Sequence, residues 1–231
     1  MPSTPTDPAA MYAVLQLCDS ALPTGAFAHS LGLETYLEDG TVADEAGFLA
    51  WARHNLHHQT VPTEGWAVRA VATAASDDDV WRVDELLRAQ ALPVQVRDAA
   101  SAMGRRMAEI TAENFPSPRL LAYADRLRAG TSHGSPAVAF ALVGTGLGVG
   151  WEQLAGAHLF STATSLTQNA VRGIPLGQNA GQRVLRALHD DVTSGVARIA
   201  RMGSDEFGAT GPGLEIAQMR HAWQRARLFM S

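Results

Sequence analysis

LPTGAFAHSLGLE, residues 22–34, is the stretch of this chain that decides between an α/β fold and an all-α fold. Its core, Ala28-His29-Ser30-Leu31-Gly32, is one small residue away from the G-x-S-x-G pattern that places a serine nucleophile on a sharp strand-to-helix turn. Such a turn requires a buried strand that runs directly into the serine. The preceding Pro23-Thr24-Gly25-Ala26-Phe27 is typical of a turn instead. We therefore predict no sheet here, and a serine esterase that uses Ser30 stays only as an alternative.

On both sides of this stretch, apolar residues recur at helical spacing. The i, i+3, i+4, i+7 pattern predicts an amphipathic helix before it, at Met11, Val14, Leu15 and Cys18. A helix that ends near Gly40 is expected after it, with His29 and Ser30 in its first turn. Asp44 is a predicted N-cap, and Pro62 is expected to begin the next helical segment, over 66–75.

The rest of the chain continues in the same way. Ser76 and Asp79 have the spacing of a capping box, and Pro93 separates the helix that they open from a long one. The long helix should bury one face, at Val96, Ala99, Met103, Met107 and Ile110. Further helices are predicted over 118–128, 137–170, 178–202 and 214–229.

No period-2 strand pattern and no internal repeat is visible, so the predicted fold is all-α. We expect a single globular helical domain of about eight to ten helices over residues 11–231, after a disordered leader at 1–10. A glycine-rich segment at 203–213 is the expected flexible connector, and 214–231 the expected interaction tail.

Composition limits the compartment and the ligands. With 231 residues, 46% of them apolar, the chain can bury one sizeable core. The single cysteine, Cys18, excludes a disulfide framework, and the N-terminus lacks the pattern of a signal peptide, so we expect a cytoplasmic protein. A net charge of −5 does not indicate a basic surface that would bind nucleic acid. No apolar run reaches the roughly 20 residues of a membrane span.

All 18 basic residues are arginine, which excludes two classes of enzyme. A Walker A loop requires lysine for the β- and γ-phosphates, and Schiff-base chemistry requires an amine. The chain is therefore neither a P-loop NTPase nor a pyridoxal-phosphate enzyme. Any nucleotide hydrolysis in its function must be the work of a partner.

Two further motifs are weak. His54, His57 and His58 form the only histidine cluster, and His54 and His58 share a helical face, but no third metal ligand is near in sequence. A histidine-based nickel or zinc carrier stays as a second alternative, with no cofactor predicted. GTGLGVG, residues 144–150, lacks the acidic residue of a dinucleotide fingerprint about 20 positions on, so close helix packing is the expected role of its glycines.

Three segments together resemble one family. They are LQLCDSALPTGAFAHSLGLETYLEDGTV at 15–42, GIPLGQNAGQRVL at 173–185 and MRHAWQRARLFMS at 219–231. In order and spacing they are similar to the urease accessory protein UreF family, from about residue 11 to the C-terminus. The serine of the opening stretch then belongs to a family signature on an all-α protein.

The resemblance implies a function without catalysis. UreF proteins form helical homodimers, bind the accessory protein UreD (UreH in some organisms) and with it recruit the GTPase UreG. The assembly delivers nickel to apo-urease, whose active-site lysine must be carbamylated. The absence of lysine from this chain agrees with GTP hydrolysis by the partner.

The resemblance also implies a set of partner-binding residues. These are Phe27, His29, Ser30, Glu34, Gln178, Gly181, Gln182, Arg220, His221, Arg227, Leu228, Phe229 and Ser231. The chain departs from the family pattern at Ala180, Ala222 and Arg225-Ala226, which puts polar contacts of those positions in doubt.

The tail has the pattern of an interaction helix in its own right. Apolar residues step by 3 and 4 along one predicted face, at Ile216, Met219, Trp223 and Ala226, while Arg220 and Arg227 lie on another. Arginine and aromatic residues are enriched at protein interfaces. The alternative is that the tail packs back on the core.

Overall fold

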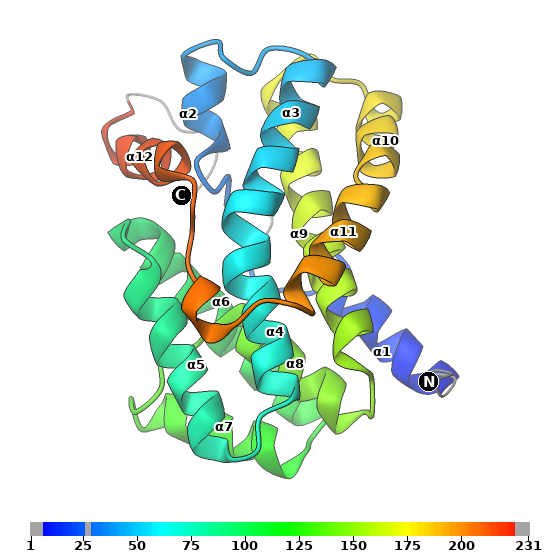
Figure 1. The fold of residues 1–231 in the computed structure, drawn as a ribbon, viewed down its shortest axis with the longest axis vertical. Coiled ribbons are helices and arrows are strands. Elements are labelled where there is room, and N and C mark those ends of the chain that lie inside the picture. Colours follow the sequence, from blue (N-terminus) through cyan, green and yellow to red (C-terminus); the bar gives the residue numbers. More distant parts are fainter. Residues whose placement is uncertain (1–6, 26–28, 225–231) are drawn as a thin grey trace.

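The computed structural model describes residues 7–25 and 29–224, which form twelve α-helical segments and three short segments of other helix types (Figure 1). No β-strand occurs in these ranges, so the all-α prediction is confirmed. The α-helices are α1 (Pro8–Cys18), α2 (Leu33–Glu38), α3 (Glu45–Asn55), α4 (Trp66–Ala72), α5 (Asp77–Gln90), α6 (Val94–Asn114), α7 (Pro118–Arg128), α8 (Pro136–Gly146), α9 (Trp151–Gly173), α10 (Gln178–Ala187), α11 (His189–Ile199) and α12 (Pro212–Arg220). The others are the π-helix η2 (Leu56–Gly65) and the 3-10 helices η3 (Ser204–Glu206) and η4 (His221–Trp223).

Several helix ends follow local capping chemistry. Asp44 accepts a hydrogen bond from the Gly47 N–H at 2.8 Å and starts α3, and Ser76 and Asp79 form the predicted capping box of α5. Gly40 ends α2 with a φ of 74°. Residues 8–10, which were expected in the disordered leader, are helical instead, because Asp7 caps α1.

One helix boundary was predicted wrongly at Pro62. The proline lies inside η2, and α3, η2 and α4 follow one another without a break. The wider π-turn and the missing proline N–H change the internal hydrogen bonds of the helix, and backbone donors from elsewhere supply partners for its carbonyls. The Thr210 N–H donates to the His58 carbonyl at 2.8 Å, and the Gly208 N–H to the Pro62 carbonyl at 3.1 Å. The connector at 203–213 therefore lies along η2, and its orange trace crosses in front of that rod in Figure 1.

A second boundary was missed in the segment predicted as one helix over 137–170. Two helices, α8 and α9, occupy it, because Gly148 has a φ of 75° and breaks the helical path. Gly144 lies so close to α9 that a side chain there would overlap Leu154. The expected close packing is thus confirmed for Gly144, whereas Gly148 makes the turn.

The core has two halves, which α9 connects. In the lower half of Figure 1, α8 is almost fully buried and packs against α4, α6 and α9. The upper half brings together α2, α3, α9, α10 and α12 through Leu33, Phe48, Trp51, Leu166, Val184 and Leu214. No helix within the described ranges is both long and apolar enough to cross a membrane.

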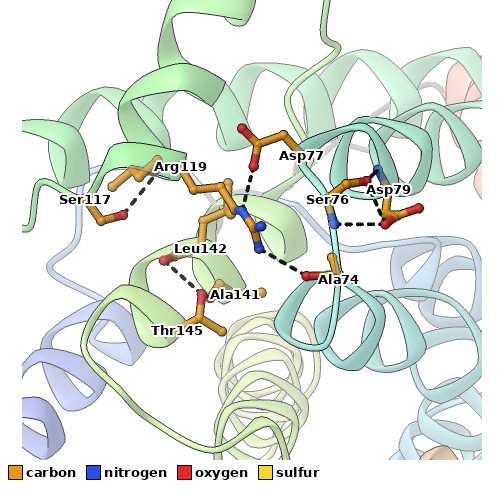
Figure 2. Close-up of polar contacts among 10 residues, drawn as sticks. Ala74, Ser76, Asp77, Asp79, Ser117, Arg119, Ala141, Leu142 and Thr145 are labelled. Carbon is orange, nitrogen blue, oxygen red and sulfur yellow. Dashed lines mark hydrogen bonds and ion pairs between the residues drawn. The ribbon is translucent and has the colours of Figure 1, made fainter.

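Polar contacts fix the lower end of the bundle, as Figure 2 shows. Arg119, in the first turn of α7, donates from Nε to Asp77 Oδ1 at 2.8 Å and from Nη1 to the Ala74 carbonyl at 3.4 Å. This side chain ties α7 to the start of α5 and to the residues that follow α4. The second family-like segment, at 173–185, and helix α12 of the tail belong to the upper half instead.

Candidate functional site: the junction between the signature segment and the tail

The turn before α2 is shaped to receive the tail helix. Leu31 and Gly32 both have left-handed backbone, with φ values of 49° and 89°. A Cβ atom on Gly32 would lie 2.9 Å from Gln218 Cγ and 3.2 Å from the Gln218 backbone nitrogen. Two features therefore require glycine at this position, namely the positive φ and the close approach of α12.

Buried polar contacts hold the tail in this turn. His221 Nε2 lies 2.7 Å from Glu34 Oε2, and the two side chains are 1% and 7% exposed. The Thr35 hydroxyl donates to the Ala217 carbonyl at 2.8 Å, and Gln218 Nε2 donates to the Leu31 carbonyl at 3.3 Å. Because an unpaired buried polar group costs about 1–3 kcal/mol, these contacts specify one position for α12 and η4.

The same turn is anchored to the core on its other side. Asn169 of α9 is fully buried and donates from Nδ2 to the His29 carbonyl at 2.7 Å. The Ser30 carbonyl accepts from the Leu33 N–H at 3.0 Å, so His29 and Ser30 precede α2 and do not form its first turn as expected. The signature segment therefore connects α9 with the tail.

Ser30 does not have the surroundings of a nucleophile. The residue is 0% exposed, and its Oγ has no hydrogen-bond partner among the residues that the structure describes. An activated serine needs a neighbouring general base and access to substrate. The residues that the structure describes give Ser30 neither, so its place in the packed junction argues against the esterase alternative.

The outward side of the tail is apolar. Ile216, Met219 and Trp223 are 49%, 41% and 87% exposed, and we call these three residues the outer tail face. The inner side contains Leu214, Ala217, Gln218 and His221, all buried. Three residues of the predicted apolar stripe thus share one face of α12 and η4, but this face points to solvent, and the fourth, Ala226, lies outside the described residues.

The structure brings together only part of the predicted site. His29, Ser30, Glu34 and His221 meet in the junction, and Arg220 is exposed on the tail. In the second motif, Gln178 and Gln182 are exposed on α10, while Gly181 is buried against Val171 and Thr167 of α9. Phe27, Arg227, Leu228, Phe229 and Ser231 lie outside the described residues, as do Arg225 and Ala226.

Some junction residues were not predicted from sequence. They are Thr35, Leu214 and Gln218. On the tail, Leu214, Gln218 and His221 follow an i, i+4, i+7 pattern. Two of these three are polar, so a search for apolar stripes passes over them. A second pass for polar residues at helical spacing opposite an apolar stripe would have found this face.

The histidine cluster makes structural contacts. His57 Nε2 lies 3.0 Å from Asp191 Oδ1, and His58 Nδ1 lies 3.0 Å from the Thr210 hydroxyl of the connector. Partial burial, with the nearby His54 and Arg198, holds the pKa of His58 below its usual value. Within the described ranges, no three His, Cys, Asp or Glu side chains are placed to hold a metal ion, which leaves the metal-carrier alternative without a site there.

The fold and this junction define an all-α protein whose signature residues position an exposed helix face. The model of the UreF family matches residues 42–189. The chain is 53% identical over 219 residues to the urease accessory protein UreF of Arthrobacter sp. (strain FB24), which covers 95% of this chain and 96% of that protein. It is 51% identical over 219 residues to the UreF of Paenarthrobacter aurescens, with 95% of this chain and 97% of that protein covered. It is 41% identical over 221 residues to the UreF of Lachnoclostridium phytofermentans, with 94% of this chain and 97% of that protein covered. The chain therefore belongs to the UreF family of urease accessory proteins.

Proposed function

We propose that this chain is a non-enzymatic helical adaptor of urease maturation in the cytoplasm. In this proposal it binds UreD (UreH) and with it recruits the GTPase UreG, so that nickel is inserted into apo-urease. The observation that carries the proposal is the outer tail face, an exposed apolar surface on a helix whose opposite side is fixed by buried polar contacts.

The outer tail face has the chemistry of a protein interface. Trp223 is 87% exposed, and tryptophan is among the residues that most often dominate binding energy. Arg220 lies next to it and is also exposed. Because the junction already holds α12 in place, a partner does not have to order this helix on binding, which reduces the entropic cost of association.

The absence of lysine supports a division of labour with UreG. A chain without a Walker A lysine has no P-loop with which to hydrolyse GTP. We expect the isolated protein to neither bind nor hydrolyse GTP, and to change nucleotide turnover only when UreG and UreD are present.

The homodimer that the resemblance implies is proposed to form through α1. This helix contains no charged residue, and its Met11, Tyr12 and Leu15 side chains are 44%, 70% and 59% exposed. Two copies of such a face can meet around a two-fold axis without burying charge. Tyr12→Arg is expected to give a monomer in light-scattering measurements, whereas Leu92→Arg, at an exposed apolar residue between α5 and α6, should leave the dimer intact.

Deletion of residues 225–231 tests the adaptor proposal. We expect the truncated protein to keep its helical circular dichroism and to lose co-elution with UreD and UreG. Arg227→Ala should reproduce most of the loss, and Arg227→Lys should restore it only in part because the planar guanidinium is absent. Co-elution of the truncated protein at wild-type affinity would refute a binding role for these residues.

A further inference from the structure

A cavity of about 140 Å³ lies where the two halves of the core meet, with Phe140 of the lower half and Leu166 of the upper half in its lining. We call it the α6–α9 cavity, because residues of those two helices line it. The last two residues of α1, residues between α1 and α2, Glu64 of η2 and the first turns of α8 complete its described lining. Val96 and Met103 of α6 were predicted to be core residues, and they are only half-buried because they face this space.

The apolar wall of the cavity is suited to an aromatic ring. It carries Met103 and Met107 of α6 and Phe140 of α8. Methionine sulfur makes favourable contacts with aromatic rings, and a ring also packs well edge-to-face against phenylalanine. The volume is close to that of an apolar cavity of about 150 Å³ that holds one benzene. The space therefore matches a single six-membered ring.

A carboxylate lies close to this apolar surface, because the Phe140 ring packs 5.4 Å from the ring of His158, the hydrogen-bond partner of Glu64. Glu64 Oε2 accepts from His158 Nε2 at 2.9 Å, and His158 is only 8% exposed. The other carboxylate oxygen, Oε1, has no protein partner within the described ranges, and the Glu64 side chain is 34% exposed. The buried histidine thus orients a carboxylate that still has a free acceptor.

The charge of the lining selects the type of ligand. Asp19 and Glu64 are the only fully charged side chains among the described lining residues, and no arginine is present. An anionic ligand would be repelled, whereas a ring that carries a hydrogen-bond donor is complementary to both the apolar side chains and the Glu64 carboxylate.

We propose that the α6–α9 cavity receives a tyrosine side chain of a partner protein, with the ring against Met103 and Phe140 and the hydroxyl donating to Glu64. This inference rests on the proposed function, because the partner belongs to the maturation assembly. It adds a second contact surface, formed by different helices from those that present the outer tail face.

Binding of p-cresol, which has the ring and hydroxyl of a tyrosine side chain, tests the cavity itself. In the full chain, titration should saturate and shift the methyl resonances of Met103 and Met107. Toluene should bind roughly tenfold more weakly, because it cannot donate to the charged carboxylate. Glu64→Gln should remove most of this preference and leave toluene binding unchanged. Absence of saturable p-cresol binding, or equal affinity for toluene, would overturn the proposal.

A filled cavity tests the partner. Ala100→Phe places a ring in the cavity and should abolish p-cresol binding and weaken co-assembly with UreD and UreG at least tenfold. Ala102→Phe, on the exposed side of α6, is the matched control and should change neither. If assembly is unchanged in Ala100→Phe, or if that variant instead loses the homodimer, a partner tyrosine is not the occupant. Trp223→Ala separates the two ideas, because it should weaken assembly whenever the adaptor proposal holds, whatever fills the cavity.

Discussion

Truncation of Trp223 to alanine should separate binding from folding. The side chain is 87% exposed and follows the last turn of α12, so its removal takes few contacts from the free protein. We expect the free energy of unfolding to change by less than about 0.5 kcal/mol, as for other surface substitutions. The effect should appear only when a partner covers the ring.

The loss on binding can be estimated from area. Complete burial of a tryptophan removes about 150–250 Å² from water, which at about 25 cal/mol/Å² corresponds to roughly 4–6 kcal/mol. Part of this is offset by the cost of ordering the side chain and by incomplete burial, so about 2–4 kcal/mol is expected for Trp223→Ala. This is a weakening of the complex by roughly 30-fold or more.

Isothermal titration of the variant into UreD and UreG measures this loss. Circular dichroism and thermal unfolding serve as folding controls. Leu121→Ala is the matched variant, since Leu121 is 44% exposed but lies on α7, at the lower end of the bundle in Figure 1 and away from the tail. An affinity for Trp223→Ala within threefold of wild type, with the fold intact, would show that the outer tail face is not the interface.

Two further substitutions and one pH titration test the roles assigned to buried groups. Ser30→Ala should leave no hydrolysis of activated esters to lose, and turnover by the wild type that the substitution abolishes would contradict the adaptor proposal. Asp84→Ala should lower the free energy of unfolding by about 3 kcal/mol or more, because Asp84 accepts hydrogen bonds from the Tyr123 hydroxyl at 2.8 Å and the His133 N–H at 2.6 Å. Chemical denaturation measures this loss, and the exposed Asp98→Ala should show no comparable effect. Burial raises the pKa of the Cys18 thiol from 9.0 to about 11, so its alkylation should stay slow at pH 8 and accelerate as the pH approaches 11. The stability that the neutral buried thiol contributes should be present below pH 9 and lost as the pH rises from 9 to about 11.

Local chemistry explains why much of the fold could be predicted. Asp44 and Ser76 cap helices through hydrogen bonds to residues three positions away, and Gly40 ends a helix through its own φ. Each of these signals is complete within a few residues of sequence. The helices that they bound were therefore placed correctly without knowledge of the rest of the molecule.

The errors arose where distant residues decide the local structure. Pro62 normally interrupts a helix, but here the chain passes through it as a π-helix, with Gly208 and Thr210 donating to its carbonyls from about 150 residues further on. Val96 was expected to be buried, because periodicity identifies an apolar face but cannot show whether another element covers it completely. Neither fact can be read from the neighbouring sequence.

The tail illustrates the same limit at the candidate site. An apolar stripe on a helix usually indicates the side that packs on the core. In α12, however, the core side is defined by Gly32 and Glu34, which present a close-fitting backbone turn and a carboxylate to Gln218 and His221. Because these polar partners come from a segment about 190 residues earlier, they direct the helix so that its apolar stripe faces outward. The signature near the N-terminus is thereby linked to the presentation of a surface at the C-terminus, which explains how a motif without any reacting group can still be necessary for the proposed binding.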